Sequence, residues 1–249
     1  MSQRWNDRYS VPLELPAVSY CLRQYAYLLP TLGTGLDLAC GLGQNSIFLR
    51  KHGLTMHGWD YSSAGLEQMA RHCSLQKVEV NQRCIDLKSA PWPNLQFDLI
   101  CVTAFLDRTL CPQILSHLKP GGILVYQTFN QVTDIVGKKL SKPRRHEFLL
   151  SQGELLLLFK ELQPLVYRDD QELTPLDHPL AGKALLIARK PGLSLTAESG
   201  LAAPWGPSQS LVENRLDLAC WSRDCLGTLL TPTKGFTKLP VCRHCLGGM

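Results

Sequence analysis

The chain has 249 residues, of which 45% are hydrophobic and 19% are charged, and its formal net charge at pH 7 is +5. This length suits one α/β domain with an additional segment, and the modest charge does not indicate a nucleic-acid partner. The first residues contain no apolar signal segment, and no stretch approaches the ~18 uninterrupted apolar residues of a membrane span. We therefore expect a cytoplasmic protein with no membrane partner.

The beginning of the chain combines polar and aromatic residues in the segment Trp5-Asn6-Asp7-Arg8-Tyr9. A helix is expected from about Ala17 to Leu29. The segment from Gly35 to Cys40 has the composition of a short buried strand, and Asn45 to His52 is expected to form the helix that follows it.

The turn between this strand and this helix contains two glycines, Gly41 and Gly43. Because glycine has no Cβ atom, a ligand can approach the backbone there, and the N–H groups that open the helix point toward it. A dinucleotide-binding loop would carry a third glycine where this chain has Ser46. The sequence therefore indicates a nucleotide-type site but not the usual dinucleotide loop.

Two neighbouring residues refine this expectation. Asp37 lies inside the strand, where its carboxylate could meet an ammonium group at the floor of a cleft. Alanine at position 39 implies that the backbone there does not need a positive φ, since alanine rarely adopts one.

Strands and helices alternate along the following hundred residues. This alternation predicts a doubly wound, mostly parallel sheet with helices on both faces and a ligand at the carboxyl ends of the strands. The final two strands are expected to form a hairpin, which gives seven strands in all. The later strands are predicted at Leu54–Trp59, Val78–Ile85, Phe97–Thr103, Ile123–Phe129, Val166–Arg168 and Ala184–Ala188, with helices from Ser62 to Cys73, Asp107 to Leu118 and Gln152 to Leu162 and a turn at Lys119–Gly122.

Two further segments differ in character from this domain. Gln131 to Glu147 is a loop-like insert whose positive residues lie within 138–145. The domain is expected to span residues 1–190, and residues 191–249 form an irregular C-terminal extension, a linker and Cys-containing tail without the composition of a core. Four cysteines in the tail have spacings within the range of tetrahedral zinc sites, although a poorly ordered tail without metal is the main expectation. They are Cys220, Cys225, Cys242 and Cys245.

The stretch Asp37-Leu38-Ala39-Cys40-Gly41-Leu42-Gly43 resembles the first motif of the class I S-adenosylmethionine-dependent methyltransferases, acidic-x-Gly-x-Gly-x-Gly, with Ala39 in place of the first glycine. The resemblance implies a Rossmann-like methyltransferase fold and S-adenosylmethionine as the cofactor. It also implies that Asp60 binds the ribose hydroxyls, that Asp86 receives the adenine amino group and that Leu87 lies against the ring. The cofactor-binding residues implied by the resemblance are Arg8, Asp37, Ala39, Cys40, Gly41, Gly43, Asp60, Tyr61, Asp86, Leu87 and Thr103.

A narrower resemblance links the segment Trp5–Tyr9, together with Phe105-Leu106-Asp107-Arg108, to a bacterial subgroup that includes the tellurite-resistance and thiopurine-type methyltransferases. It implies a small-molecule acceptor: a thiol, an amine or a metalloid oxyanion. In that subgroup the N-terminal arm folds over the cofactor. This suggests Arg8 as a partner for the cofactor carboxylate and Trp5 or Tyr9 as a lid. The expected substrate-binding residues are Phe105, Asp107 and Arg108.

Several alternatives remain open at this level. Asp107, His146 and His178 are possible bases, and none of them can be assigned. A nucleic-acid or protein methyltransferase or binding module would use the basic insert 138–145 and the Cys tail, but the residues after the fourth strand, Thr103-Ala104-Phe105-Leu106, are not the Asn/Asp-Pro-Pro-Tyr type of base-modifying relatives. A nicotinamide-dependent reductase would need the missing third glycine.

Overall fold

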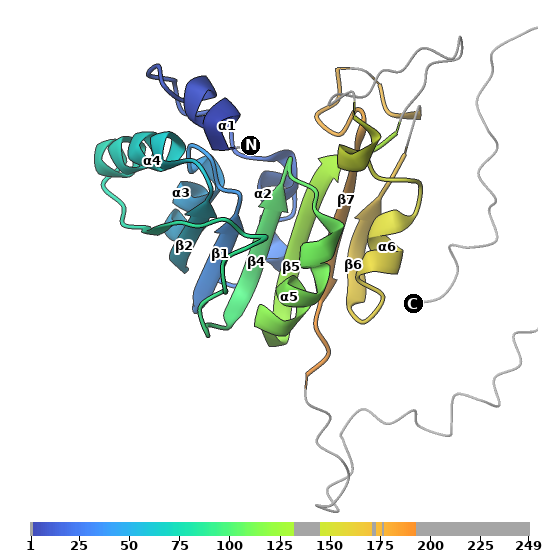
Figure 1. The fold of residues 1–249 in the computed structure, drawn as a ribbon. Coiled ribbons are helices and arrows are strands. Elements are labelled where there is room, and N and C mark those ends of the chain that lie inside the picture. The colour runs from blue at the N-terminus through green and yellow to red at the C-terminus, as the bar shows by residue number, and fades with distance from the viewer. Residues whose placement is uncertain (1, 132–144, 171–172, 176, 193–249) are drawn as a thin grey trace, which may run out of the picture. The chain divides into compact units, whose positions relative to one another are not determined.

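The computed structural model describes residues 2–131, 145–170, 173–175 and 177–192. The strands are β1 (Thr34–Leu38), β2 (Thr55–Asp60), β3 (Asn81–Cys84), β4 (Phe97–Thr103), β5 (Leu118–Phe129), β6 (Gln163–Arg168) and β7 (Lys183–Arg189). They form one sheet in the order β3-β2-β1-β4-β5-β7-β6 (Figure 1). The first five strands pair in parallel, while β7 is antiparallel to both β5 and β6. The predicted seven-stranded, mostly parallel sheet is confirmed.

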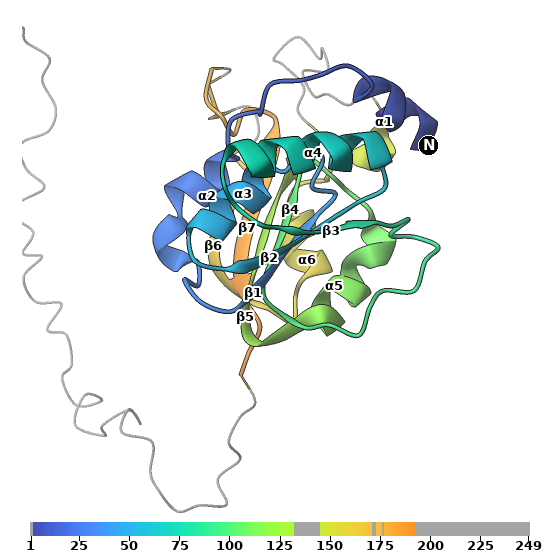
Figure 2. The same cartoon turned by 90° about the vertical axis from the view of Figure 1, so that its left-hand side faces the viewer.

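Helices cover both faces of the sheet. They are α1 (Ser2–Arg8), α2 (Tyr20–Gln24), α3 (Gln44–Lys51), α4 (Ser63–Leu75), α5 (Cys111–His117) and α6 (Glu154–Leu158), with short 3₁₀ turns η1 (Ala26–Leu28), η2 (Arg108–Leu110) and η3 (His146–Phe148). In Figure 2 the sheet is seen edge-on, with α2 and α3 on one side and α5 and α6 on the other. Both views place α1 next to α4.

The central strand β4 shows why this arrangement is stable. Leu99 and Cys101 belong to the apolar cluster under α2 and α3, whereas Ile100 and Val102 belong to the cluster under α5 and α6. All four side chains are fully buried. Because successive side chains of a strand point to opposite faces, only a nearly unbroken apolar sequence can bury both faces.

The predicted helix from Ala17 to Leu29 is wrong in extent. Only Tyr20–Gln24 is α-helical, followed by the 3₁₀ turn η1. The break lies at Tyr25, whose φ of −114° and ψ of 27° are not helical. The start is held by tertiary contacts, since the N–H of Ser19 donates to Asn45 Oδ1 and that of Cys21 donates to Gln127 Oε1.

The predicted turn at Lys119–Gly122 lies inside β5. Phe97 pairs with Leu118 and Leu99 pairs with Ile123, so β5 contains extra residues between two paired positions of β4. The residue after β7 binds these extra residues, because Gly121 N donates to the carbonyl oxygen of Lys190 and Lys190 N donates to that of Gly122. The turn residues are therefore hydrogen-bonded without ending the strand.

Two other helix predictions were too long. The helix expected from Asp107 to Leu118 consists of η2 followed by α5, and it ends at His117 because Leu118 belongs to β5. The helix expected from Gln152 to Leu162 is α6 alone. It begins after Gly153, which has a left-handed backbone, and the chain enters β6 at Gln163.

The basic insert lies outside the described residues except for Arg145, and so do the four tail cysteines. The division after Lys190 and the possible zinc site remain predictions. Among the residues that the structure describes, no helix has the length and apolar character needed to cross a membrane.

Candidate functional site

The glycine turn after β1 uses three left-handed backbone positions. Ala39 has a φ of 56°, Gly41 of 54° and Gly43 of 82°. The expectation that residue 39 needs no positive φ is therefore wrong. The alternating left-handed residues turn the chain sharply from β1 into α3. Ala39 therefore has a backbone conformation that normally favours glycine. An ideal Cβ at Gly43 would lie only 2.4 Å from Met69 Cγ, so α4 packs directly against this turn.

Asp37 is buried beneath the turn, with 1% of its surface exposed. Its Oδ2 accepts a 2.7 Å hydrogen bond from the hydroxyl of Ser46, the residue that stands where a dinucleotide loop would have glycine. Burial raises the pKa of Asp37 to about 7, although the Ser46 hydrogen bonds oppose this shift. The sequence analysis treated Ser46 only as an absent glycine and did not predict its hydrogen bond to Asp37.

Asp60, the last residue of β2, joins two loops through its carboxylate. Oδ2 accepts from Gly41 N and Oδ1 accepts from Ser62 N, each at 2.8 Å. Burial raises the pKa of Asp60, while these backbone hydrogen bonds oppose the rise. Each carboxylate oxygen can accept more than one hydrogen bond, so Asp60 keeps acceptor capacity for a ligand.

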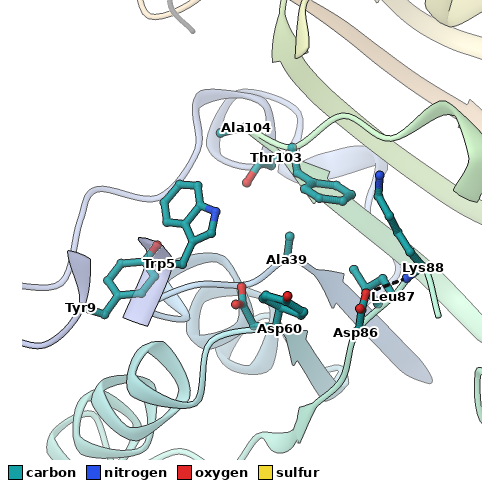
Figure 3. Close-up of a pocket in the computed structure, with 11 residues that line it drawn as sticks. Trp5, Tyr9, Ala39, Asp60, Asp86, Leu87, Lys88, Thr103 and Ala104 are labelled. Carbon is teal, nitrogen blue, oxygen red and sulfur yellow. Dashed lines mark hydrogen bonds between the residues drawn. The ribbon is translucent and has the colours of Figure 1, made fainter. Parts of the chain in front are cut away.

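A cavity of about 420 Å³ lies at the carboxyl ends of β1, β2 and β4, next to the residues that follow β3 (Figure 3). Figure 3 shows Trp5 and Tyr9 on one side of this space and Asp86, Leu87 and Lys88 on the other. The lining residues are Trp5, Tyr9, Ala39, Asp60, Tyr61, Asp86, Leu87, Lys88, Thr103, Ala104 and Phe105. Residues from distant parts of the chain therefore converge at the edge of the sheet that the strand pattern predicted.

Most predicted cofactor residues lie at this cavity. Six of them contribute to its lining: Ala39, Asp60, Tyr61, Asp86, Leu87 and Thr103. The predicted lid residues Trp5 and Tyr9 also line it, with stacked rings whose centroids are 5.8 Å apart.

The other predicted cofactor residues are not among those that line the cavity, namely Arg8, Asp37, Cys40, Gly41 and Gly43. Gly41 lies beneath Tyr9, since an ideal Cβ there would be 3.1 Å from the tyrosine hydroxyl. Cys40 is buried, and its sulfur lies 3.6 Å from that of Met69. The guanidinium of Arg8 lies over the ring of Trp5, 5.4 Å from its centroid, so its predicted contact with the cofactor carboxylate remains untested.

Lys88 is a lining residue that the sequence did not single out. Its ammonium forms a 2.6 Å ion pair with Oδ2 of Asp107, which follows β4. The pair connects the loops after β3 and β4 at the cavity wall. Its position in the sequence could have indicated this role, because Lys88 directly follows the predicted pair Asp86-Leu87.

The contacts of Asp107 disfavour its use as a base. Asp107 caps η2, because its Oδ1 accepts from both the N–H and the hydroxyl of Thr109. Burial alone would raise the pKa of Asp107, but the bonds from Lys88 and Thr109 outweigh burial and leave the pKa lowered. A carboxylate with a lowered pKa is a weak proton acceptor.

Arg108 has equally committed contacts. Its guanidinium binds both carboxylate oxygens of Glu154 and donates to the carbonyl oxygens of Glu147 and Leu149. This arrangement fixes the segment after β4 to the segment before α6. Of the three predicted substrate residues, only Phe105 lines the cavity.

The two histidines considered as bases are not among the lining residues. The Nδ1 atom of His178 accepts from Leu180 N, and its ring packs edge-on against Tyr20. No group of three or more His, Cys, Asp or Glu side chains suited to a metal ion occurs within the described ranges.

The residues present suit S-adenosylmethionine. Asp60 and Asp86 supply carboxylates at separate places along the cavity, and Asp60 also binds the glycine turn through Gly41 N. The volume lies within the ~300–1,000 Å³ usual for small-molecule sites.

Comparison with known proteins supports the same conclusion. Residues 36–122 match a family described as "Methyltransferase domain". A ubiquinone biosynthesis O-methyltransferase from Coxiella burnetii is 31% identical over 101 residues, which cover 39% of this chain and 43% of the relative. The probable S-adenosyl-L-methionine-dependent methyltransferase TehB from Haemophilus influenzae is 24% identical over 144 residues, or 54% of this chain and 48% of the relative. The chain thus spans about half the length of these curated relatives.

Solved structures show the same fold. The crystal structure of TehB from Haemophilus influenzae superposes with a TM-score of 0.55 at 19% identity, covering 76% of this chain and 66% of that one. An S-adenosylmethionine-dependent methyltransferase from Clostridium acetobutylicum gives 0.51 at 16% identity, covering 77% and 93%.

Residues 36–122 match a methyltransferase domain, and the fold of the described residues is that of solved S-adenosylmethionine-dependent methyltransferases. The predicted resemblance is confirmed, and proteins of the TehB type are among its similar relatives. S-adenosylmethionine, the predicted cofactor, is the one that this family implies.

Replacing Ala39 with glycine should stabilise the protein. A left-handed backbone costs a non-glycine residue ~1–2 kcal/mol, and glycine loses ~0.4–1 kcal/mol through its freer unfolded chain. We expect a net gain of roughly 0.5–1 kcal/mol, which is a rise in melting temperature of about 1–4 °C for a domain of this size. Differential scanning calorimetry measures the change.

Gly43→Ala is the matched opposite change, since its new Cβ would meet Met69. It should lower the melting temperature. If Ala39→Gly also lowers it, the left-handed backbone at residue 39 is not a source of strain.

Replacing Asp37 with asparagine should change how stability depends on pH. An unfolded aspartate releases its proton near pH ~3.9, whereas the folded Asp37 retains it up to a pKa of about 7. The unfolded state therefore binds fewer protons in this interval, and the free energy of unfolding falls as pH rises from about 4 to 7. Asp37→Asn should remove this part of the decline. Urea titrations at pH 5 and pH 8, without cofactor, test the expectation, and parallel pH profiles for the two proteins would disprove it.

Proposed function

We propose that this protein transfers the methyl group of S-adenosylmethionine to a small-molecule acceptor. The observation that carries the proposal is the position of Asp60, which lines the cavity while binding the glycine turn through Gly41 N. This places a carboxylate beside the backbone cradle of a class I methyltransferase domain.

Three parts of the chain would hold the cofactor. Asp60 would accept hydrogen bonds from the ribose hydroxyls, because two carboxylate oxygens suit two adjacent donors. Asp86 would receive the adenine amino group, with the apolar side chain of Leu87 against the ring. The turn after β1 would be the third part, and Asp37, which is buried beneath it, supports the turn through its hydrogen bond with Ser46.

The bound cofactor supplies an activated methyl group on a positively charged sulfur. The contribution of the protein is then mainly to orient the acceptor and to exclude water. Trp5, Tyr9 and Phe105 provide aromatic surface for both purposes. No base is assigned, because Asp107 has a lowered pKa and is engaged by Lys88 and Thr109.

A small acceptor is supported by the cavity and by the names of two relatives, a ubiquinone biosynthesis O-methyltransferase and TehB. Thiols, amines and metalloid oxyanions remain the acceptor classes to be tested. The alternative of a nucleic-acid or protein acceptor depends on the insert 138–145 and the Cys tail, which lie outside the described residues except for Arg145. Arg145 itself is exposed and pairs with Glu147.

The proposal predicts that S-adenosylmethionine and S-adenosylhomocysteine bind and that Asp60→Asn weakens binding by about 10- to 100-fold. This range corresponds to losing a hydrogen bond to a charged group, which contributes ~1.5–3 kcal/mol. Isothermal titration calorimetry with S-adenosylhomocysteine measures the affinity.

Asp98→Asn is the matched control. Asp98 also accepts a backbone hydrogen bond, from Thr34 N, and pairs with Lys119, but it lies near the amino end of β4, away from the cavity. Its variant should lose stability and keep its affinity. Binding of a nicotinamide dinucleotide instead of S-adenosylhomocysteine would overturn the proposed function.

A further inference from the structure

One buried side chain of α4 contacts the main chain of the N-terminal segment at three points. Gln68 is 5% exposed. Its Nε2 donates to the carbonyl oxygens of Tyr9 at 2.5 Å and Val11 at 2.7 Å, and its Oε1 accepts from Leu13 N at 2.8 Å. The segment from residue 9 to residue 13 thus follows the outer surface of α4.

These contacts use both the NH₂ group and the oxygen of the side-chain amide. The two N–H groups have carbonyl partners and the oxygen has an N–H partner, so the orientation of the side chain is defined by its surroundings. Residues 11–15 form neither helix nor strand. Gln68 therefore supplies hydrogen bonds that a neighbouring strand would otherwise provide.

The same segment carries Tyr9 to a narrow space between two glycines. An ideal Cβ at Gly65 of α4 would lie 3.0 Å from Cδ2 of Tyr9, and one at Gly41 would lie 3.1 Å from its hydroxyl oxygen. The tyrosine ring consequently reaches from α4 to the glycine turn. Any displacement of residues 9–13 would change the cavity that Tyr9 lines.

A second contact links this segment to the carboxylate at the cavity. Asn6 Oδ1 accepts a 2.7 Å hydrogen bond from the hydroxyl of Ser62, and the N–H of Ser62 donates to Asp60. The helix α1 and the cavity are therefore connected through Ser62, and Gln68 holds the chain immediately after α1.

We propose that Gln68 is a positioning residue for ligand binding: by holding the main chain of residues 9–13 on α4, it keeps Trp5 and Tyr9 closed over the cavity. The inference rests on the proposed function, because the ligand in question is the cofactor. Gln68 does not line the cavity and acts through the segment that does.

Different substitutions of Gln68 have distinct expected effects. Gln68→Met preserves the approximate volume of the side chain and removes all three hydrogen bonds. Gln68→Glu preserves the shape of the side chain but places a carboxylate oxygen against the carbonyl oxygens of Tyr9 and Val11. These negatively polarised oxygens repel one another. Both should release the segment, and Gln68→Glu should do so more strongly.

The first measurement is calorimetric titration of the full-length chain with S-adenosylhomocysteine. Gln68→Met should weaken binding by about tenfold, or ~1.4 kcal/mol, because a released segment must be ordered again when the ligand binds. Gln76→Ala is the control, because Gln76 ends the same helix and contacts the exposed Lys51 instead of the N-terminal segment. It should bind like the wild type.

The second measurement is amide hydrogen exchange of the ligand-free proteins, followed by mass spectrometry of peptides that cover residues 5–15. In Gln68→Met, exchange should accelerate there, including at Leu13, while peptides from β1 and β4 stay unchanged. A merely structural role in α4 would instead lower the melting temperature and accelerate exchange across residues 63–75.

The outcomes separate the two proposals. If the wild type does not bind S-adenosylhomocysteine, the proposed function fails, and exchange at residues 9–13 still decides whether Gln68 holds the segment. If the wild type binds and Gln68→Met binds equally well, or if exchange of the segment is unchanged, the positioning role is disproved.

Discussion

The candidate site depends on the hydrogen bonds that the carboxylate of Asp60 accepts. Its two oxygens bind the N–H of Gly41 in the turn after β1 and the N–H of Ser62 at the start of α4. Two loops that begin on neighbouring strands are thus fixed to one side chain. Ser62 extends the connection, because its hydroxyl caps α4 by accepting from Gly65 N and also donates to Asn6 of α1. The glycine turn, the fourth helix and the N-terminal helix share this one anchor.

The sheet could be predicted because its sequence signals are local. Strand β4 was predicted with its observed bounds, since an apolar run buried on both faces has few other structures available. The short second helix could not be predicted, because the boundary at Tyr25 and the contacts of Ser19 and Cys21 depend on Asn45 and Gln127, which are distant in the sequence. The extra residues within β5 could not be predicted either, because their hydrogen bonds are made with Lys190, which is distant in the sequence.

The site was predictable where the motif places residues at strand ends, as for Asp60, Asp86 and Thr103. It was less predictable where a side chain has a choice of partners. Arg108 has the charge expected of a substrate contact, yet Glu154 and two carbonyl oxygens occupy its donors. Lys88 is the opposite case. Nothing in its irregular loop indicates a role, yet it pairs with Asp107 and lines the cavity. For Ala39, residue preference alone predicted an ordinary backbone, whereas the geometry of the turn requires a left-handed one.

The reversed direction of β7 determines how the two ends of the domain relate to the cavity. Because β7 runs antiparallel to β5, Arg189 pairs with Ile123, which itself pairs with Leu99 near the amino end of β4, while the cavity lies at the carboxyl ends of the parallel strands. The N-terminal helix, in contrast, carries Trp5 into the cavity lining. A spectroscopic label on α1 would therefore report on ligand binding, whereas the same label just after β7 would lie at the opposite edge of the sheet and serve as an internal reference.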